Sequence, residues 1–77
     1  MRKLNNISLA DYKRFLTFIG CQLYRIKGGH EHWSHPNANR PITLQSHISP
    51  VPAFIIRQHL RYLGMSTEAF LTIIEKL

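Results

Sequence analysis

The sequence predicts an α+β domain, a two-layer sandwich in which helices cover one face of a three-stranded antiparallel sheet. Apolar residues recur at helical spacing near both ends of the chain, within residues 7–20 and 49–77. Between them, residues 21–45 alternate in polarity and are interrupted by turn residues, which is typical of strands. The predicted order is α-β-β-β-α plus a short C-terminal helix, in a single domain spanning residues 1–77.

The first helix is predicted within residues 7–20. Ser8 is a plausible N-cap, and Asp11 forms a near capping box with Asp in place of Glu. Gly20 suits the position just after the helix. The apolar face comprises Leu9, Tyr12, Phe15, Leu16 and Ile19. Lys13, Arg14 and Thr17 are expected on the wet side, which faces solvent.

Three strands are predicted next. "CQLYRIK" and "HEHWSH" alternate on either side of Gly28-Gly29, a two-residue turn signal typical of a hairpin. Pro36-Asn37-Ala38-Asn39 is a turn cluster. "RPITLQ" is a short third strand, and its Pro41 indicates an edge or the start of the strand.

Two helices complete the prediction. The first spans residues 49–64, with Pro50 and Pro52 in its entry and first turn and Gly64 at its end. The second spans residues 67–77 and is capped by Ser66. Phe54, Phe70 and Cys21 are expected in the core, His59 in packing or at its rim, and Arg57 and Arg61 on a solvated helix face.

The charge of the chain points to an anionic partner. Ten Lys and Arg against four Asp and Glu give a formal net charge of +6 in 77 residues, which favours nucleic acid, although basic residues also serve solubility. Cys21 is alone, so no intramolecular disulfide is possible and a reducing cytoplasm is expected. No apolar run is long enough for a membrane span. Charged residues interrupt any signal-peptide core, so Met1-Arg2-Lys3 is interpreted as the start of the mature fold.

The shortage of acids disfavours two kinds of catalytic site. A two-metal nuclease needs several converging carboxylates, and a glycosidase needs a carboxylate pair. Only Glu31 lies in the histidine-rich segment from Lys27 to Pro41. A structural zinc site is also disfavoured, because strand alternation separates His35 from His30 and His32 and the chain supplies no paired further ligands. We therefore expect no metal or other cofactor.

The same alternation suggests a catalytic role for His30. Trp33 needs burial and is expected to face the helices, which leaves His30 and His32 on the open face near Arg25 and Lys27. An imidazole can take a proton from a ribose 2′-OH near neutral pH, and the cations can hold the phosphate. A surface hairpin histidine without a task remains the alternative. For His47, a loop hydrogen-bonding role and a second-site role both stay open.

The order of these segments resembles the HicA family of toxins, small mRNA interferases of bacterial and archaeal toxin–antitoxin pairs. "QLYRIKGGHEHWSHP" is similar to the family's strand–Gly-Ser-His–strand signature ending in His-Pro. "NRPITL" is similar to its Arg-Arg-Val-Thr-Val strand, and "IRQHLRYLGMSTEAFL" to its C-terminal helices. The likeness covers nearly the whole chain. The chain departs from the family at Gly29, where serine is commonest, at Gln45, at His59 and in the proline-rich stretch "SHISPVP".

The resemblance implies a fold like that of double-stranded-RNA-binding domains and a metal-independent endoribonuclease that cleaves mRNA, inhibiting translation and growth. It implies one essential histidine, His30 here, and a HicB-like antitoxin that covers this face. The expected RNA-binding residues are Lys27, Arg25, Gly28, Gly29, His32 and Arg40, and His32 could assist proton transfer. A non-catalytic RNA-binding module of the same shape and a protein-interaction domain are the alternative functions.

Overall fold

The computed structural model describes residues 4–77; Met1-Arg2-Lys3, the expected start of the fold, lies outside the described residues. The described chain runs in the order η1 (Leu4–Asn6), α1 (Leu9–Phe18), β1 (Gln22–Lys27), β2 (His30–Ser34), β3 (Ile42–Gln45), α2 (Ala53–Leu63) and α3 (Thr67–Lys76). The α+β class and the order of its elements are thereby confirmed, with the 3-10 turn η1 in addition. No helix among residues 4–77 is long and apolar enough to cross a membrane.

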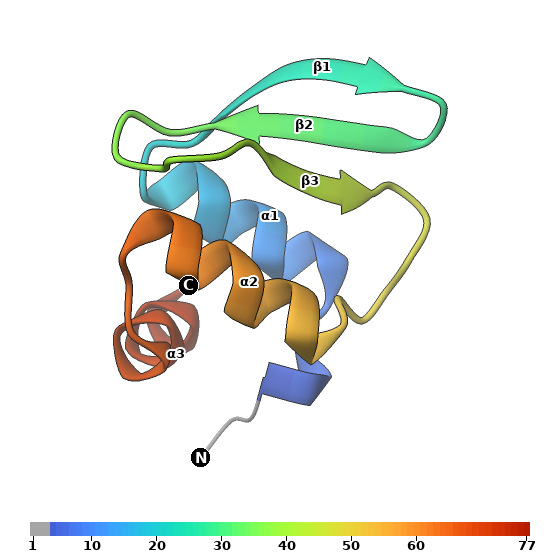
Figure 1. The fold of residues 1–77 in the computed structure, drawn as a ribbon. Coiled ribbons are helices and arrows are strands. Elements are labelled where there is room, and N and C mark those ends of the chain that lie inside the picture. The colour runs from blue at the N-terminus through green and yellow to red at the C-terminus, as the bar shows by residue number, and fades with distance from the viewer. Residues whose placement is uncertain (1–3) are drawn as a thin grey trace.

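The elements form two layers (Figure 1). The sheet is antiparallel in the order β1-β2-β3, and α1 and α2 lie against one of its faces. α3 packs on both helices, farther from the sheet. The opposite face of the sheet is uncovered, and β1 and β3 are its two edges.

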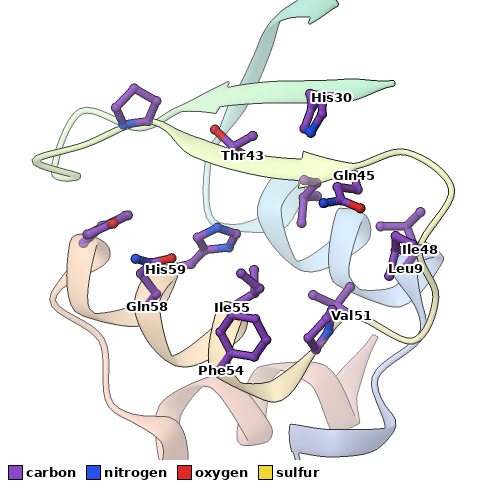
Figure 2. A pocket seen from close by; sticks show the side chains of 14 residues that line it. Leu9, His30, Thr43, Gln45, Ile48, Val51, Phe54, Ile55, Gln58 and His59 are labelled. Atoms are coloured by element: carbon purple, nitrogen blue, oxygen red, sulfur yellow. The ribbon is translucent and has the colours of Figure 1, made fainter. Parts of the chain in front are cut away.

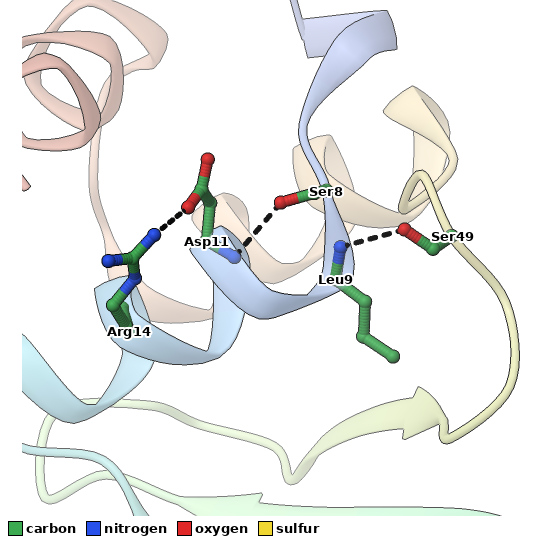
Figure 3. A network of polar contacts seen from close by, with 5 residues as sticks. All are labelled: Ser8, Leu9, Asp11, Arg14 and Ser49. Carbon is green, nitrogen blue, oxygen red and sulfur yellow. Dashed lines mark hydrogen bonds and ion pairs between the residues drawn. The ribbon is translucent and has the colours of Figure 1, made fainter.

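The start of α1 is fixed by its cap and by the loop that precedes α2 (Figure 3). The Ser8 Oγ accepts a hydrogen bond from the Asp11 N–H at 3.1 Å, which confirms the predicted cap. The Leu9 N–H donates to the Ser49 Oγ at 3.0 Å, a contact between residues 40 positions apart. Asp11 also pairs with Arg14 one turn later. The two bonds to Ser8 and Ser49 satisfy backbone N–H donors that an α-helix leaves free in its first turn.

The core lies between the sheet and the helices. The Phe15 and Phe70 rings meet edge to face at 4.6 Å between centroids. Each such side chain contributes roughly 1.5–3 kcal/mol when fully buried. Cys21 is buried as predicted, and burial raises the pKa of its thiol to about 11. The largest fully buried side chains are Tyr12, Phe15, Phe70, Ile7, Leu16, Ile42 and Ile56.

Two expectations about burial were wrong. Phe54 is 67% exposed rather than in the core, because two helical residues turn by about 200° and place it opposite the buried Ile56. Lys13 was expected on the wet side of α1, but it is half-buried in an ion pair with Glu31.

Several element boundaries also differ from the prediction, including the start of β3, which is Ile42 rather than Arg40. α2 begins at Ala53 with Pro52 as its N-cap, so Pro50 lies outside the helix. The reason is local, since a residue that precedes proline is sterically driven out of the helical region. β2 ends at Ser34, so His35 falls outside the strand.

Candidate functional site

His30 stands at the end of the sheet, directly after the hairpin turn. Gly28 and Gly29 have φ of 58° and 81°, the left-handed conformation at both positions that a two-residue hairpin turn requires. The turn leads straight into β2, of which His30 is the first residue. The His30 side chain is exposed while Trp33 is buried, so the predicted division of faces is confirmed. The sequence therefore places one accessible imidazole beside a glycine turn.

Cross-strand pairing brings cations to the same face. Lys27 lies directly opposite His30, and Arg25 lies opposite His32. Directly opposed residues share a face of the sheet. On the other side of β2, the His32 Nδ1 lies 3.3 Å from the Thr43 Oγ1. The open face thus carries two histidine–cation pairs, one step of the strand alternation apart.

His47 reaches this site from the loop after β3. The Ser46 N–H donates to the Gly29 carbonyl at 2.8 Å, which extends the strand pairing beyond β3 and draws the loop to the hairpin. A methyl group placed on Gly29 would lie 3.8 Å from the His47 Nδ1, in ordinary van der Waals contact. The imidazole of His47, itself exposed, therefore lies beside the residue that precedes His30. This position favours the second-site interpretation of His47 that the sequence had left open.

Glu31 fixes the hairpin from the covered face. Its carboxylate pairs with the Lys13 Nζ at 2.7 Å and lies 3.3 Å from the Trp33 Nε1, which donates to it. Burial alone would raise the pKa of Glu31, but hydrogen bonds from Lys13, Ser46 and Trp33, together with the charge of Lys13, hold that pKa below its ordinary value. The carboxylate thus joins α1, β2 and the loop that carries His47. Sequence reasoning noticed this acid but not its role, because Lys13 and Ser46 are distant from it in the chain.

The third histidine of the segment has a structural task. The Asn37 N–H donates to the His35 Nδ1 at 3.0 Å, so in the neutral ring the Nε2 carries the proton. That Nε2 lies 2.8 Å from the Ile19 carbonyl, which accepts from it. His35 therefore anchors the turn after β2 to the end of α1. Within residues 4–77, no group of three or more His, Cys, Asp or Glu side chains is arranged to hold a metal ion.

A groove of about 520 Å³ lies beside the site, between β3 and α2 (Figure 2). His30 and Gln45 line it from the sheet, and Phe54 and Gln58 from α2. His59 also lines it, although this residue is only 3% exposed. The groove was not foreseen, because Phe54 was assigned to the core, whereas its exposed side chain forms part of one wall of the groove.

His59 is a buried polar residue that joins three elements. Its Nδ1 lies 2.7 Å from the Tyr12 Oη, and a hydrogen bond with the Thr43 backbone fixes its other side. Burial lowers the pKa of His59 to about 4, against the weaker opposing effect of that backbone bond. The ring is therefore neutral near pH 7, accepts from the Tyr12 hydroxyl and donates to the Thr43 carbonyl. The expected packing role of His59 is confirmed, with a polar connection that the sequence did not indicate.

One predicted site residue lies apart from the others. Arg40 precedes β3, whereas Gln45 at the other end of β3 is the residue that pairs with His30. Ile42, the first residue of β3, pairs with Trp33, which is roughly 10 Å along β2 from His30, so Arg40 lies toward the end of the sheet away from the hairpin. The structure does bring together Lys27, Gly28, Gly29 and His30, with Arg25 and His32 one step along the sheet.

Comparisons with protein-family models, with curated proteins and with solved structures find no match for this chain.

Proposed function

We propose that this chain is a HicA-type endoribonuclease toxin with a fold like that of double-stranded-RNA-binding domains, in which His30 transfers the proton of the attacking ribose 2′-OH. The observation that carries the proposal is the direct pairing of His30 with Lys27 on the open face. An exposed imidazole supplies the base, and an ammonium group opposite it supplies a phosphate contact. The +6 net charge of the chain supports an RNA substrate.

The proposed reaction is an internal transfer at one phosphodiester. Lys27 and Arg25 hold the phosphate, and His30 takes the proton from the 2′-OH. A bond forms between the 2′ oxygen and phosphorus, and the bond from phosphorus to the 5′ oxygen breaks. The products are a 2′,3′-cyclic phosphate and a 5′-hydroxyl that must receive a proton.

A second imidazole is the natural source of that proton. His47 is the better candidate, because its exposed ring lies beside Gly29, the residue that precedes His30. His32 is the alternative, and its ring is already in contact with the Thr43 hydroxyl. In either case one histidine gains a proton and the other loses one, so the reaction needs no other acid or base.

The proposed partner is a HicB-like antitoxin that covers the His30 face in the cytoplasm. β1 supports such a contact because it is an edge strand, with unpaired backbone groups beside the site. Leu23 is 41% exposed and Ile26 64% exposed on this strand. Their pairing with buried Trp33 and Glu31 puts them on the helix side of β1, so a protein that paired with this edge would cover them there and reach Lys27 and His30 on the open face.

The decisive experiment compares RNA cleavage by the wild-type chain and by His30→Ala. We expect the variant to keep its fold, measured by circular dichroism, to lose at least about 100-fold in cleavage rate, and to lose growth arrest in cells. Lys76→Ala, a substitution at the last residue of α3, is the control and should cleave as wild type does. Undiminished cleavage by His30→Ala would refute the assignment. Salt-dependent RNA binding without cleavage by wild type would instead favour the non-catalytic RNA-binding module.

The pH dependence of cleavage identifies the second group. A two-histidine mechanism gives a bell-shaped profile, since one imidazole must be neutral and the other protonated. Removing the acid should abolish the alkaline limb of the bell. We expect this loss in His47→Ala and a retained bell in His32→Ala; the reverse result would assign the role to His32.

A further inference from the structure

The strand β1 contains a bulge that changes which side chains reach the open face. Leu23 pairs with Trp33, which is buried against the helices, whereas Arg25 pairs with His32 on the open face. In a regular strand, residues two apart share a face, so the irregularity between Leu23 and Arg25 inserts Tyr24 as the extra residue. Bulges of this kind re-aim side chains at functional sites.

The bulge leaves the Tyr24 ring beside His32 and open to solvent. The two ring centroids are 6.3 Å apart with a 40° angle between the planes. Tyr24 is 56% exposed, so the ring contributes little to the core. One flank of the ring is supported by His32, whose own position is set by its contact with Thr43. The result is an aromatic ring held in place with much of its surface accessible.

The charged side chains around the Tyr24 ring favour an anionic ligand. Arg25 follows Tyr24 directly, and Lys27 pairs with His30 farther along the same strand. The three strands contain one carboxylate, Glu31, and it is buried on the covered face in its pair with Lys13. The open face is therefore cationic and aromatic, which is the combination that binds single-stranded nucleic acid through phosphate contacts and base stacking.

We propose that Tyr24 stacks an unpaired RNA base and so positions the strand whose phosphate lies at Lys27 and His30. This inference rests on the proposed function and specifies its substrate as unpaired RNA. Tyr24 is three residues before Lys27, roughly 10 Å along the strand, so the stacked base belongs to a nucleotide near the scissile phosphate. A base inside a duplex has both faces covered by its neighbours and cannot make this contact.

The test measures binding of a fluorescent single-stranded oligoribonucleotide to the full chain carrying His30→Ala, which keeps the RNA intact. Adding Tyr24→Ala should weaken binding by about 5-fold to about 100-fold, whereas Tyr24→Phe should stay within about 3-fold because the ring remains. Phe18→Ala is the matched control, since Phe18 is also an exposed aromatic (64%) but lies on α1. Tyr24→Val, which keeps a strand-favouring side chain, replaces Tyr24→Ala if the latter fails to fold.

Each outcome decides the proposal. Tyr24-dependent binding that is stronger for single strands than for a duplex of the same sequence supports it. Equal binding by the Tyr24→Ala and Tyr24→Phe proteins, or tighter binding of the duplex, overturns it even if wild type cleaves RNA. Absence of any RNA binding overturns it too and favours a protein partner for this face. Tyr24-dependent binding by a wild-type chain that never cleaves refutes the nuclease alone.

Discussion

Replacing His59 by glutamine should remove most of the loss of stability that we expect between pH 7 and pH 5. His59 is buried against Tyr12 and Thr43, and its pKa falls from 6.5 to about 4 on folding because burial penalises the charged ring. Between these two values the unfolded chain binds a proton that the folded chain does not. The contribution of His59 is therefore complete above about pH 6.5 and is lost as the pH falls toward 4.

The size of the effect follows from the shift. About 2.5 pKa units at 1.36 kcal/mol each give about 3 kcal/mol in total, of which about 2 kcal/mol is lost between pH 7 and pH 5. A chain of this length has a free energy of unfolding of about 4–12 kcal/mol. Protonation of this one buried histidine can therefore remove a substantial part of the stability of the domain at low pH.

Urea unfolding followed by circular dichroism, at pH values from 7 to 5, measures the effect. The wild-type free energy of unfolding should fall by about 2 kcal/mol more than that of His59→Gln over this range. His47→Gln is the control, because it also removes one histidine but at an exposed position. Equal slopes for wild type and His59→Gln would refute the reasoning, and so would a flattened slope in His47→Gln.

Substitutions at two further positions, Gly29 and Glu31, test the hairpin. Gly29→Ala should lower the free energy of unfolding by about 1–2 kcal/mol, because φ at this residue is +81° while the nearest atom leaves room for a methyl group. Gly29→Asn should lower it less, since asparagine tolerates this conformation. Equal losses for the two variants in urea unfolding would contradict the backbone explanation. Glu31→Gln should cost about 1–3 kcal/mol, because Lys13 loses its charged partner. It should also remove the further loss of stability below pH 4.5, since the lowered pKa of Glu31 stabilises the fold only while the carboxylate is ionised. Urea unfolding of Glu31→Gln with and without Lys13→Met checks this, and additive effects would contradict the pairing.

The candidate site divides into a part that local sequence predicts and a part that it does not. The Gly28-Gly29 turn and the alternation of β2 predicted that His30 would face outward and Trp33 inward, as found. A hairpin of two residues also fixes its own register, which is why Lys27 was foreseen near His30. Arg40 was assigned to the site although the predicted antiparallel order of the strands places the C-terminal end of β3, not its start, beside the Gly28-Gly29 turn.

The sequence by itself determined the set of elements, their caps and turns, and the face on which each strand residue lies wherever the strand is regular. These depend on neighbours within a few positions, such as Ser8 with Asp11. The tertiary structure alone decided two things: the bulge that exposes Tyr24 and the approach of His47 to Gly29. Each depends on how segments far apart in the chain pack together, and side-chain periodicity does not encode which segment will cover which.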